Sequence, residues 1–135
     1  MNNILEQAQA IKNDIVEYRR TIHENPEVGD TLPKTKAYVM DKLRELGYEP
    51  KEICESGIVA TIEGPKPGKT FLLRADMDAL PMEETPNCDF ASKNGAMHSC
   101  GHDMHTAMLL GAAKLLRQNQ DQIEGTVKLV FQPDE

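Results

Sequence analysis

The feature that most constrains this chain is one ten-residue segment, residues 96–105, which carries three imidazoles, one thiol and one carboxylate beside a glycine. Thiolate sulfur and neutral imidazole nitrogen are ligands that a borderline-soft divalent ion prefers. Gly101 stands between Cys100 and His102 and can adopt backbone conformations closed to other residues, so a turn there can aim both side chains at one ion. The segment therefore predicts a metal site. The alternative is a loop that contains His and Cys without binding metal.

Two apolar, strand-like runs flank this segment. Residues 70–75 form the first run and lead into Asp76 and Asp78, and residues 126–131 form the second, which precedes Glu135. Between them, residues 106–117 carry apolar side chains at helical spacing. In open α/β sheets, ligands gather at the carboxyl ends of the strands. We therefore expect these three carboxylates at one edge of a sheet.

The remaining periodicity predicts two helices and a further strand. Residues 4–22 and 35–46 each carry one apolar stripe at three- and four-residue steps, which is typical of helices with one buried face. Residues 58–62 predict a strand, and a Gly/Pro turn links them to the run at 70–75, so these two strands are expected to pair as neighbours. Residues 82–96 are expected to form an irregular loop of the kind that often carries function.

Composition narrows the function classes. The net charge of −7 argues against a nucleic-acid partner, because phosphate binding needs clustered Lys and Arg. No apolar run approaches the ~20 residues of a membrane span, so no membrane partner is expected. The three cysteines are an odd number without a signal-peptide pattern, which favours the cytoplasm. Cys54 and Cys88 lack metal-binding neighbours and are expected to be structural.

Four segments, in this order, resemble motifs of the metal-dependent N-acyl-amino-acid amidohydrolases, which include hippurate hydrolases, aminoacylases and auxin-conjugate hydrolases. They are residues 18–27 (YRRTIHENPE), 73–81 (LRADMDALP), 97–105 (MHSCGHDMH) and 131–135 (FQPDE). The resemblance implies a three-layer, zinc-exopeptidase-like α/β catalytic domain with a mostly parallel mixed sheet. It also implies that residues 1–135 are the N-terminal part of that domain. The rest of the domain and an inserted lid, which often mediates dimerisation, would be absent from this chain.

The same resemblance implies roles for single residues. Cys100 and His102 match two ligands of a dinuclear metal centre, and Glu135 matches the first of two paired glutamates, the general base. The second glutamate and two histidine ligands would follow beyond residue 135. Asp78 is placed to hold a ligand imidazole.

The implied activity is metal-assisted hydrolysis of N-acyl amino acids to a carboxylic acid and a free amino acid. The expected cofactors are two divalent ions, zinc or manganese, with cobalt or nickel also admitted. The full-length protein is expected to form a homo-oligomer through its lid, and the 135-residue chain alone to be inactive. One alternative is a non-catalytic metal-binding or interaction module, whose shell Asp76 or His98 would complete. Another is a two-metal nuclease or phosphatase, for which Arg74 and Lys93 would grip phosphate.

Other polar residues receive structural roles or are left open. His23 is expected to hydrogen-bond or pack rather than to bind metal. His105 falls in the first turn of the predicted helix, where it is placed to orient a ligand. Asp103 is left open between the N-cap of that helix and a chemical group. Asp76 and Asp78 have the alternative role of turn residues.

Overall fold

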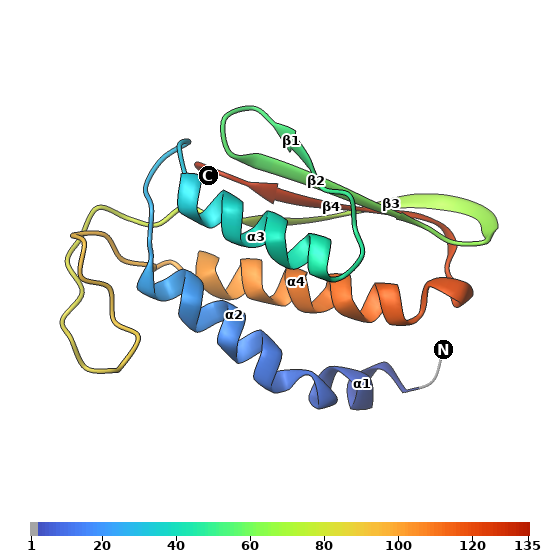
Figure 1. Cartoon of the computed structure of the whole chain (residues 1–135), viewed down its shortest axis with the longest axis horizontal. Helices are drawn as coiled ribbons and strands as arrows, with labels where there is room; N and C mark the ends of the chain where they lie inside the picture. The colour runs from blue at the N-terminus through green and yellow to red at the C-terminus, as the bar shows by residue number, and fades with distance from the viewer. Residues whose placement is uncertain (1–2) are drawn as a thin grey trace.

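The computed structural model describes residues 3–135 as a four-stranded sheet with helices packed on one of its faces (Figure 1). The α/β class and the mixed sheet predicted from the sequence are confirmed. The elements in chain order are α1 (Ile4–Ala10), α2 (Lys12–Glu24), α3 (Pro33–Glu45), β1 (Lys51–Ile53), β2 (Gly57–Glu63), β3 (Lys66–Asp76), α4 (His102–Gln118), the 3-10 turn η1 (Gln120–Gln122) and β4 (Glu124–Gln132).

The strands lie in the order β1-β2-β4-β3. The pairs β1/β2 and β2/β4 are antiparallel, and the parallel pairing is that of β3 with β4, where Asp76 lies opposite Gln132. The prediction that residues 58–62 and 70–75 pair as neighbours is wrong, because β4 lies between them. Leu129 and Phe131 of β4 are fully buried, which suits a strand paired on both sides.

Two glycines allow β4 to lie between β2 and β3. A Cβ at Gly64 would lie 1.8 Å from the Ile123 carbonyl oxygen, and one at Gly68 would lie 2.6 Å from the Glu124 carbonyl oxygen. The chain entering β4 therefore passes against bare backbone at the β2–β3 turn, and Gly64 donates its N–H to the Gly125 carbonyl at 2.9 Å. Larger residues at these positions would exclude β4 from the gap between the two strands.

The N-terminal helix predicted over residues 4–22 is two helices. Ile11 has φ −103° and ψ 13°, outside the helical range, and separates α1 from α2. Asn25 ends α2 just before Pro26, since proline disfavours the helical conformation of the residue that precedes it. Pro33 opens α3 at its first turn, where its missing N–H costs nothing.

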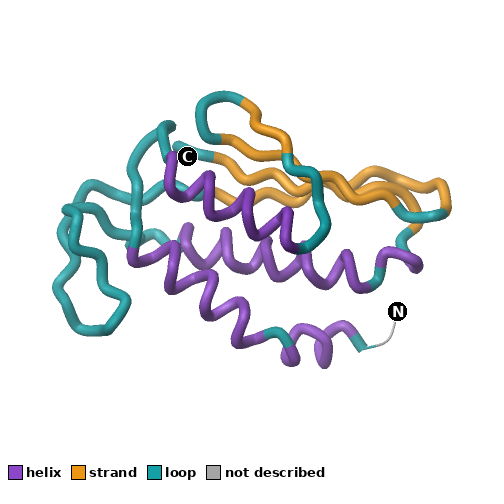
Figure 2. The backbone as a smooth tube through the Cα atoms, viewed as in Figure 1, coloured by secondary structure: helices purple, strands orange, loops and turns teal. Residues whose placement is uncertain are grey.

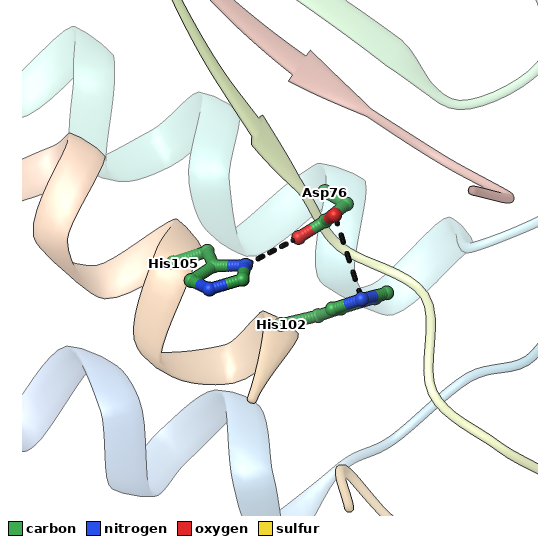
Figure 3. A group of neighbouring side chains, drawn as sticks. All are labelled: Asp76, His102 and His105. Carbon is green, nitrogen blue, oxygen red and sulfur yellow. Dashed lines mark hydrogen bonds and ion pairs between the residues drawn. The ribbon is translucent and has the colours of Figure 1, made fainter. Parts of the chain in front are cut away.

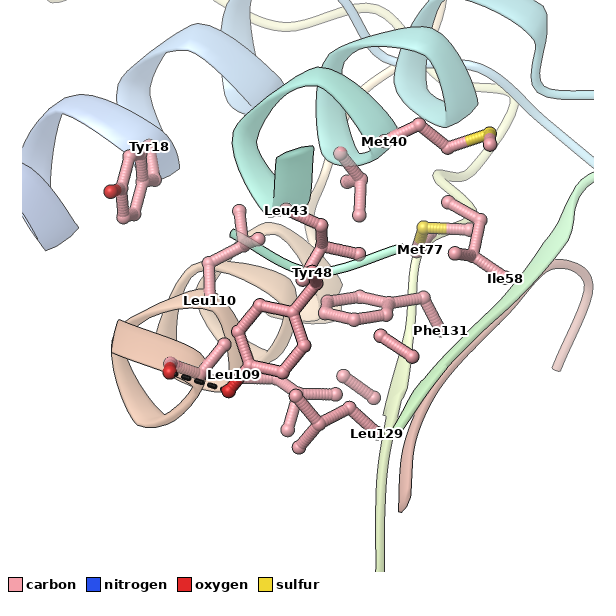
Figure 4. Close-up of a cluster of buried hydrophobic side chains, with 14 of the residues drawn as sticks. Tyr18, Met40, Leu43, Tyr48, Ile58, Met77, Leu109, Leu110, Leu129 and Phe131 are labelled. Atoms are coloured by element: carbon pink, nitrogen blue, oxygen red, sulfur yellow. Dashed lines mark hydrogen bonds between the residues drawn. The ribbon is translucent and has the colours of Figure 1, made fainter. Parts of the chain in front are cut away.

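The hydrophobic core lies between the sheet and the helices α3 and α4 (Figure 4). Leu43 of α3 and Leu110 of α4 are fully buried against Ile58, Leu129 and Phe131 of the strands. α2 packs mainly on α4. This packing fixes α4 beside β3 and β4, and so fixes where its first turn lies relative to the strand ends.

A long irregular segment joins β3 to α4, as expected for residues 82–96 (Figure 2). Leu80 and Met97 exchange two backbone hydrogen bonds, of 2.9 and 3.0 Å, and thereby close the base of the loop 81–96. The ends of β3 and β4 and the start of α4 meet beside this base. Among residues 3–135, no helix has both the length and the apolar character needed to cross a bilayer.

Candidate metal centre

The segment that the sequence singled out forms the entry into α4. Gly101 is the N-cap residue with φ +92°, a left-handed conformation that glycine adopts without strain, and His102 is the first helical residue. The turn therefore presents Cys100 and His102, two residues apart, at the carboxyl edge of the sheet. His102 is buried, whereas Cys100 is exposed.

Asp78 holds the His102 imidazole. The Nδ1 atom of His102 lies 2.9 Å from the Asp78 carbonyl oxygen and 3.0 Å from its Oδ1. Because both oxygens accept, Nδ1 carries a hydrogen, and Nε2 is the ring nitrogen that Asp78 leaves available to a metal. The sequence-based role of Asp78, to hold a ligand imidazole, has the geometry it requires.

The free nitrogen of His102 faces two further donors. Its Nε2 atom lies 3.5 Å from Glu135 Oε2, and the Cys100 sulfur belongs to the same group, within which all donor atoms lie no more than 4.8 Å apart. Two ligands about 2.1 Å from one tetrahedral ion lie roughly 3.4 Å from each other. The thiol, imidazole and carboxylate set therefore fits a divalent ion of the zinc type. Glu135 is anchored through its N–H, which donates to Asp78 Oδ1 at 3.2 Å.

A second cluster adjoins the first through His102 (Figure 3). Asp76 Oδ1 lies 2.8 Å from Nδ1 of His105, and Asp76 Oδ2 lies 3.4 Å from Nε2 of His102. The two imidazole rings stack with their centroids 5.7 Å apart. Asp76 is therefore more than a turn residue. One of its carboxylate oxygens contacts His105, and the other lies near Nε2 of His102, the nitrogen that also faces Glu135.

Several charges keep Asp76 ionised. Burial raises the pKa of this carboxyl, but the hydrogen bond with His105 and the charges of His102 and Arg74 outweigh burial and hold the pKa below its ordinary value. Arg74 lies 3.0 Å from Asp76 Oδ2 and donates to Gln132 at 2.9 Å. A guanidinium paired in this way is not free to grip phosphate, which disfavours the nuclease alternative.

His98 stays outside both clusters. The ring is 4% exposed, and neither of its nitrogens has a hydrogen-bond partner among the described residues. Burial lowers the pKa of His98 to about 4, so the ring is neutral. The structure does not bring His98 into a ligand set with Cys100, as the metal-module alternative would require.

Asp103 is not the N-cap of α4, because Gly101 occupies that position. Its carboxylate instead accepts from Arg19 at 2.7 Å and lies 2.8 Å from Nδ1 of His23. The expectation that His23 is a hydrogen-bonding residue is confirmed, and its other nitrogen contacts Glu84. Sequence reasoning missed Glu84 and Arg19, since a loop glutamate and a helical arginine carry no pattern that points to a buried partner.

Comparison with known proteins agrees with this geometry. Residues 72–135, which include the end of β3, both clusters and β4, match the model of Peptidase family M20/M25/M40. Over 94% of its length the chain is 50% identical to thermostable carboxypeptidase 2 of Saccharolobus solfataricus, and over 90% it is 43% identical to an N-acyl-L-amino acid amidohydrolase of Geobacillus stearothermophilus. The chain is a relative of the M20 peptidases. The family resemblance found in the sequence is thereby confirmed.

The M20 relationship extends to three dimensions. The fold matches a crystal structure of a dinuclear metal-binding M20 peptidase from Bacillus subtilis with a TM-score of 0.89 and 39% identity, over 94% of this chain and 36% of that one. The chain spans about a third of the length of the relatives it matches: 35% of the carboxypeptidase and 34% of the amidohydrolase. The Cys100, His102 and Glu135 cluster lies within the segment that matches the M20 family model.

Proposed function

We propose that this chain supplies the N-terminal part of the catalytic domain of a metal-dependent amidohydrolase that cleaves N-acyl amino acids. The observation that carries the proposal is the group of Cys100, His102 and Glu135 around the one imidazole nitrogen that Asp78 leaves free. M20 relatives named as amidohydrolases and deacetylases support the reaction class. The remainder of the catalytic domain and a lid that mediates homo-oligomerisation would lie in other parts of the protein.

Each residue of the cluster has a separate task. Cys100 and His102 would hold metal, and Asp78 keeps Nε2 of His102 available by binding the hydrogen on Nδ1. Divalent ions, when bound, supply Lewis-acid polarisation of the amide carbonyl and lower the pKa of the attacking water. Glu135 would take a proton from that water while the water oxygen bonds to the carbonyl carbon of the amide. It would then deliver the proton to the leaving nitrogen as the C–N bond breaks, giving an acid and a free amino acid.

The donor set guides the choice of metal. One thiolate among imidazole and carboxylate ligands favours zinc, while the mixed set also accepts manganese, cobalt or nickel. We propose two ions per site, in line with the dinuclear M20 peptidase to which the fold is similar. We propose the cytoplasm as the location, which the odd number of cysteines supports.

Activity of the full-length protein tests the proposal. Protein reconstituted with zinc or with manganese is offered N-acetyl amino acids, N-blocked peptides and a phosphodiester. We expect turnover of the N-acetyl amino acids, with release of the free amino acid. Cleavage of N-blocked peptides alone would move the protein to the carboxypeptidases, to which it is also similar. Stoichiometric metal without hydrolysis of any amide would favour the non-catalytic metal-binding module.

A further inference from the structure

A buried cluster of hydrogen-bonded side chains lies next to Cys100 and His102 and takes no part in the proposed reaction. His23 of α2 sits between two carboxylates, with Nδ1 2.8 Å from Asp103 Oδ2 and Nε2 2.9 Å from Glu84 Oε1. The side chains are 4%, 1% and 6% exposed, respectively. Burial on this scale requires that every charged member be paired, so the cluster has a defined geometry.

The hydrogen bonds of the cluster are complete. Each ring nitrogen of His23 lies within hydrogen-bond distance of one carboxylate oxygen, Nδ1 of Asp103 and Nε2 of Glu84. Arg19 adds a guanidinium, which donates from Nε to Asp103 at 2.7 Å. The Phe90 ring covers this end of the cluster, lying 5.0 Å from the Arg19 guanidinium and 5.5 Å from the His23 ring. The cluster thus links two carboxylates to an imidazole and a guanidinium, and the His23, Asp103 and Glu84 side chains in it are almost fully buried.

The cluster joins three segments that are distant in sequence. Asp103 lies in the first turn of α4, directly after the metal-site residue His102. Glu84 lies in the loop 81–96, where its second carboxylate oxygen accepts from the N–H of Ser92 at 2.7 Å. Ser92 in turn donates through its hydroxyl to the Ala96 carbonyl, just before Met97 at the base of the loop. One imidazole of α2 therefore contacts both the loop that precedes Cys100 and the helical turn that follows His102.

We propose that His23 is a positioning residue for the metal centre, which holds the first turn of α4 and the loop 81–96 in the arrangement that metal binding requires. It acts through Asp103 on one side and through Glu84 on the other, without contact to the ligand atoms. This inference rests on the proposed function, because it assumes that Cys100 and His102 bind metal. Partners that orient metal ligands typically contribute 10- to 100-fold to affinity, and we expect about tenfold here, since His23 acts one step further out.

A matched contact between the same two helices serves as the control. Lys114 of α4 donates to Asp14 of α2 at 2.6 Å and so joins α2 and α4 away from Cys100 and His102. The side chains are 28% and 44% exposed, so the pair is partly solvated and its loss should cost little. Lys114→Ala therefore tests whether any loosening of α2 on α4 disturbs the metal centre.

The experiment compares the full-length wild type with His23→Ala, Glu84→Ala, Lys114→Ala and Cys100→Ser. Zinc affinity is measured by competition with a chelator, and hydrogen–deuterium exchange is measured on the metal-free proteins. We expect His23→Ala and Glu84→Ala to weaken zinc binding about tenfold and to speed exchange across residues 81–105. Lys114→Ala should change neither. Glu84→Ala removes a loop side chain, so it decides the matter if His23→Ala does not fold.

The outcomes separate this inference from the proposed function. Wild-type zinc affinity in Glu84→Ala, or a loss in Lys114→Ala equal to that in His23→Ala, would overturn the positioning role. Retention of zinc by Cys100→Ser would instead overturn the ligand assignment on which the proposed function depends. Loss of zinc in Cys100→Ser with no change in His23→Ala would leave the proposed function in place and remove the inference alone.

Discussion

The two ring nitrogens of His102 have different partners. Nδ1 is taken by Asp78, which approaches from the end of β3, while Nε2 faces Glu135 from the end of β4 and Asp76 from β3. A ligand histidine needs this division, because only one nitrogen can bind metal while the other fixes the ring. The chemistry at residue scale therefore depends on two parallel strands ending at the same level.

We predict that Cys100→Ser and His102→Ala in the full-length protein each weaken metal binding by more than about 100-fold and abolish amidase activity, since each removes a ligand atom. Metal content and zinc affinity of the purified variants provide the measurement. Cys88→Ser is the control, because Cys88 belongs to neither donor cluster among the described residues. Full metal content and near-normal turnover in either variant would contradict the ligand assignment.

For Glu135→Gln we predict retained metal and a loss of turnover of roughly 100- to 10,000-fold, because the amide has the same shape but cannot take a proton from water. The side chain is 57% exposed and lies at the open side of the cluster, as suits a group that meets substrate. Metal analysis together with kcat separates the two roles open to this carboxylate. A loss of metal equal to that of Cys100→Ser would make Glu135 a ligand.

The sequence was informative at this scale where short-range spacing determined the chemistry. Cys100 and His102 lie close to each other in the chain and Asp78 follows a strand end, so their proximity in the structure could be anticipated. The buried partners of His23 could not be predicted, because Asp103 and Glu84 lie 80 and 61 residues away from it. Such pairings arise from helix packing, which local patterns do not encode.

At the scale of elements, periodicity predicted where helices and strands lie but not how the strands are ordered. The runs at 58–62 and 70–75 are neighbours in sequence, yet β4 separates them in the sheet. The only local sign was the pair of glycines at 64 and 68, which is equally typical of an ordinary turn. Strand order depends on long-range burial, and Leu129 and Phe131 secure the central place for β4.

Tyr48 connects two elements and gives a prediction about pH. The residue follows α3, is 3% exposed, and donates its hydroxyl to the Ala113 carbonyl of α4 at 2.7 Å. Burial raises the pKa of Tyr48 to about 12, although the charge of Arg117 opposes the shift. A raised pKa means that the stabilising contribution is complete below the unfolded value near 10 and is lost as the pH rises towards 12.

We therefore predict that Tyr48→Phe destabilises the full-length protein by about 1 kcal/mol at pH 7, through loss of the hydrogen bond. The difference between wild type and variant should shrink above pH 10, because wild-type Tyr48 must stay protonated in its buried site. Urea unfolding of both proteins between pH 7 and 11 supplies the measurement. A difference that stays constant over this range would show that the Tyr48 hydroxyl does not carry the effect.

At the scale of the whole molecule, one edge of the sheet is left apolar. Among residues 3–135, β3 is paired with β4 alone. Three consecutive side chains of β3 are exposed: Phe71 at 60%, Leu72 at 60% and Leu73 at 41%. Adjacent large apolar side chains on an edge strand with free backbone groups favour pairing with another chain.

We predict that residues 1–135 expressed alone self-associate, bind zinc weakly and do not hydrolyse N-acetyl amino acids. The association follows from the β3 edge, and the weak binding follows because Cys100 and His102 are too few ligands for two ions. Light scattering, zinc titration and an amidase assay test the three parts. Leu72→Lys is the matched variant: a charge on the edge strand should reduce association without restoring activity, since it leaves the metal cluster unchanged. A monodisperse, active wild-type chain would contradict the prediction, because the complete site would then have to be built from the two clusters around His102.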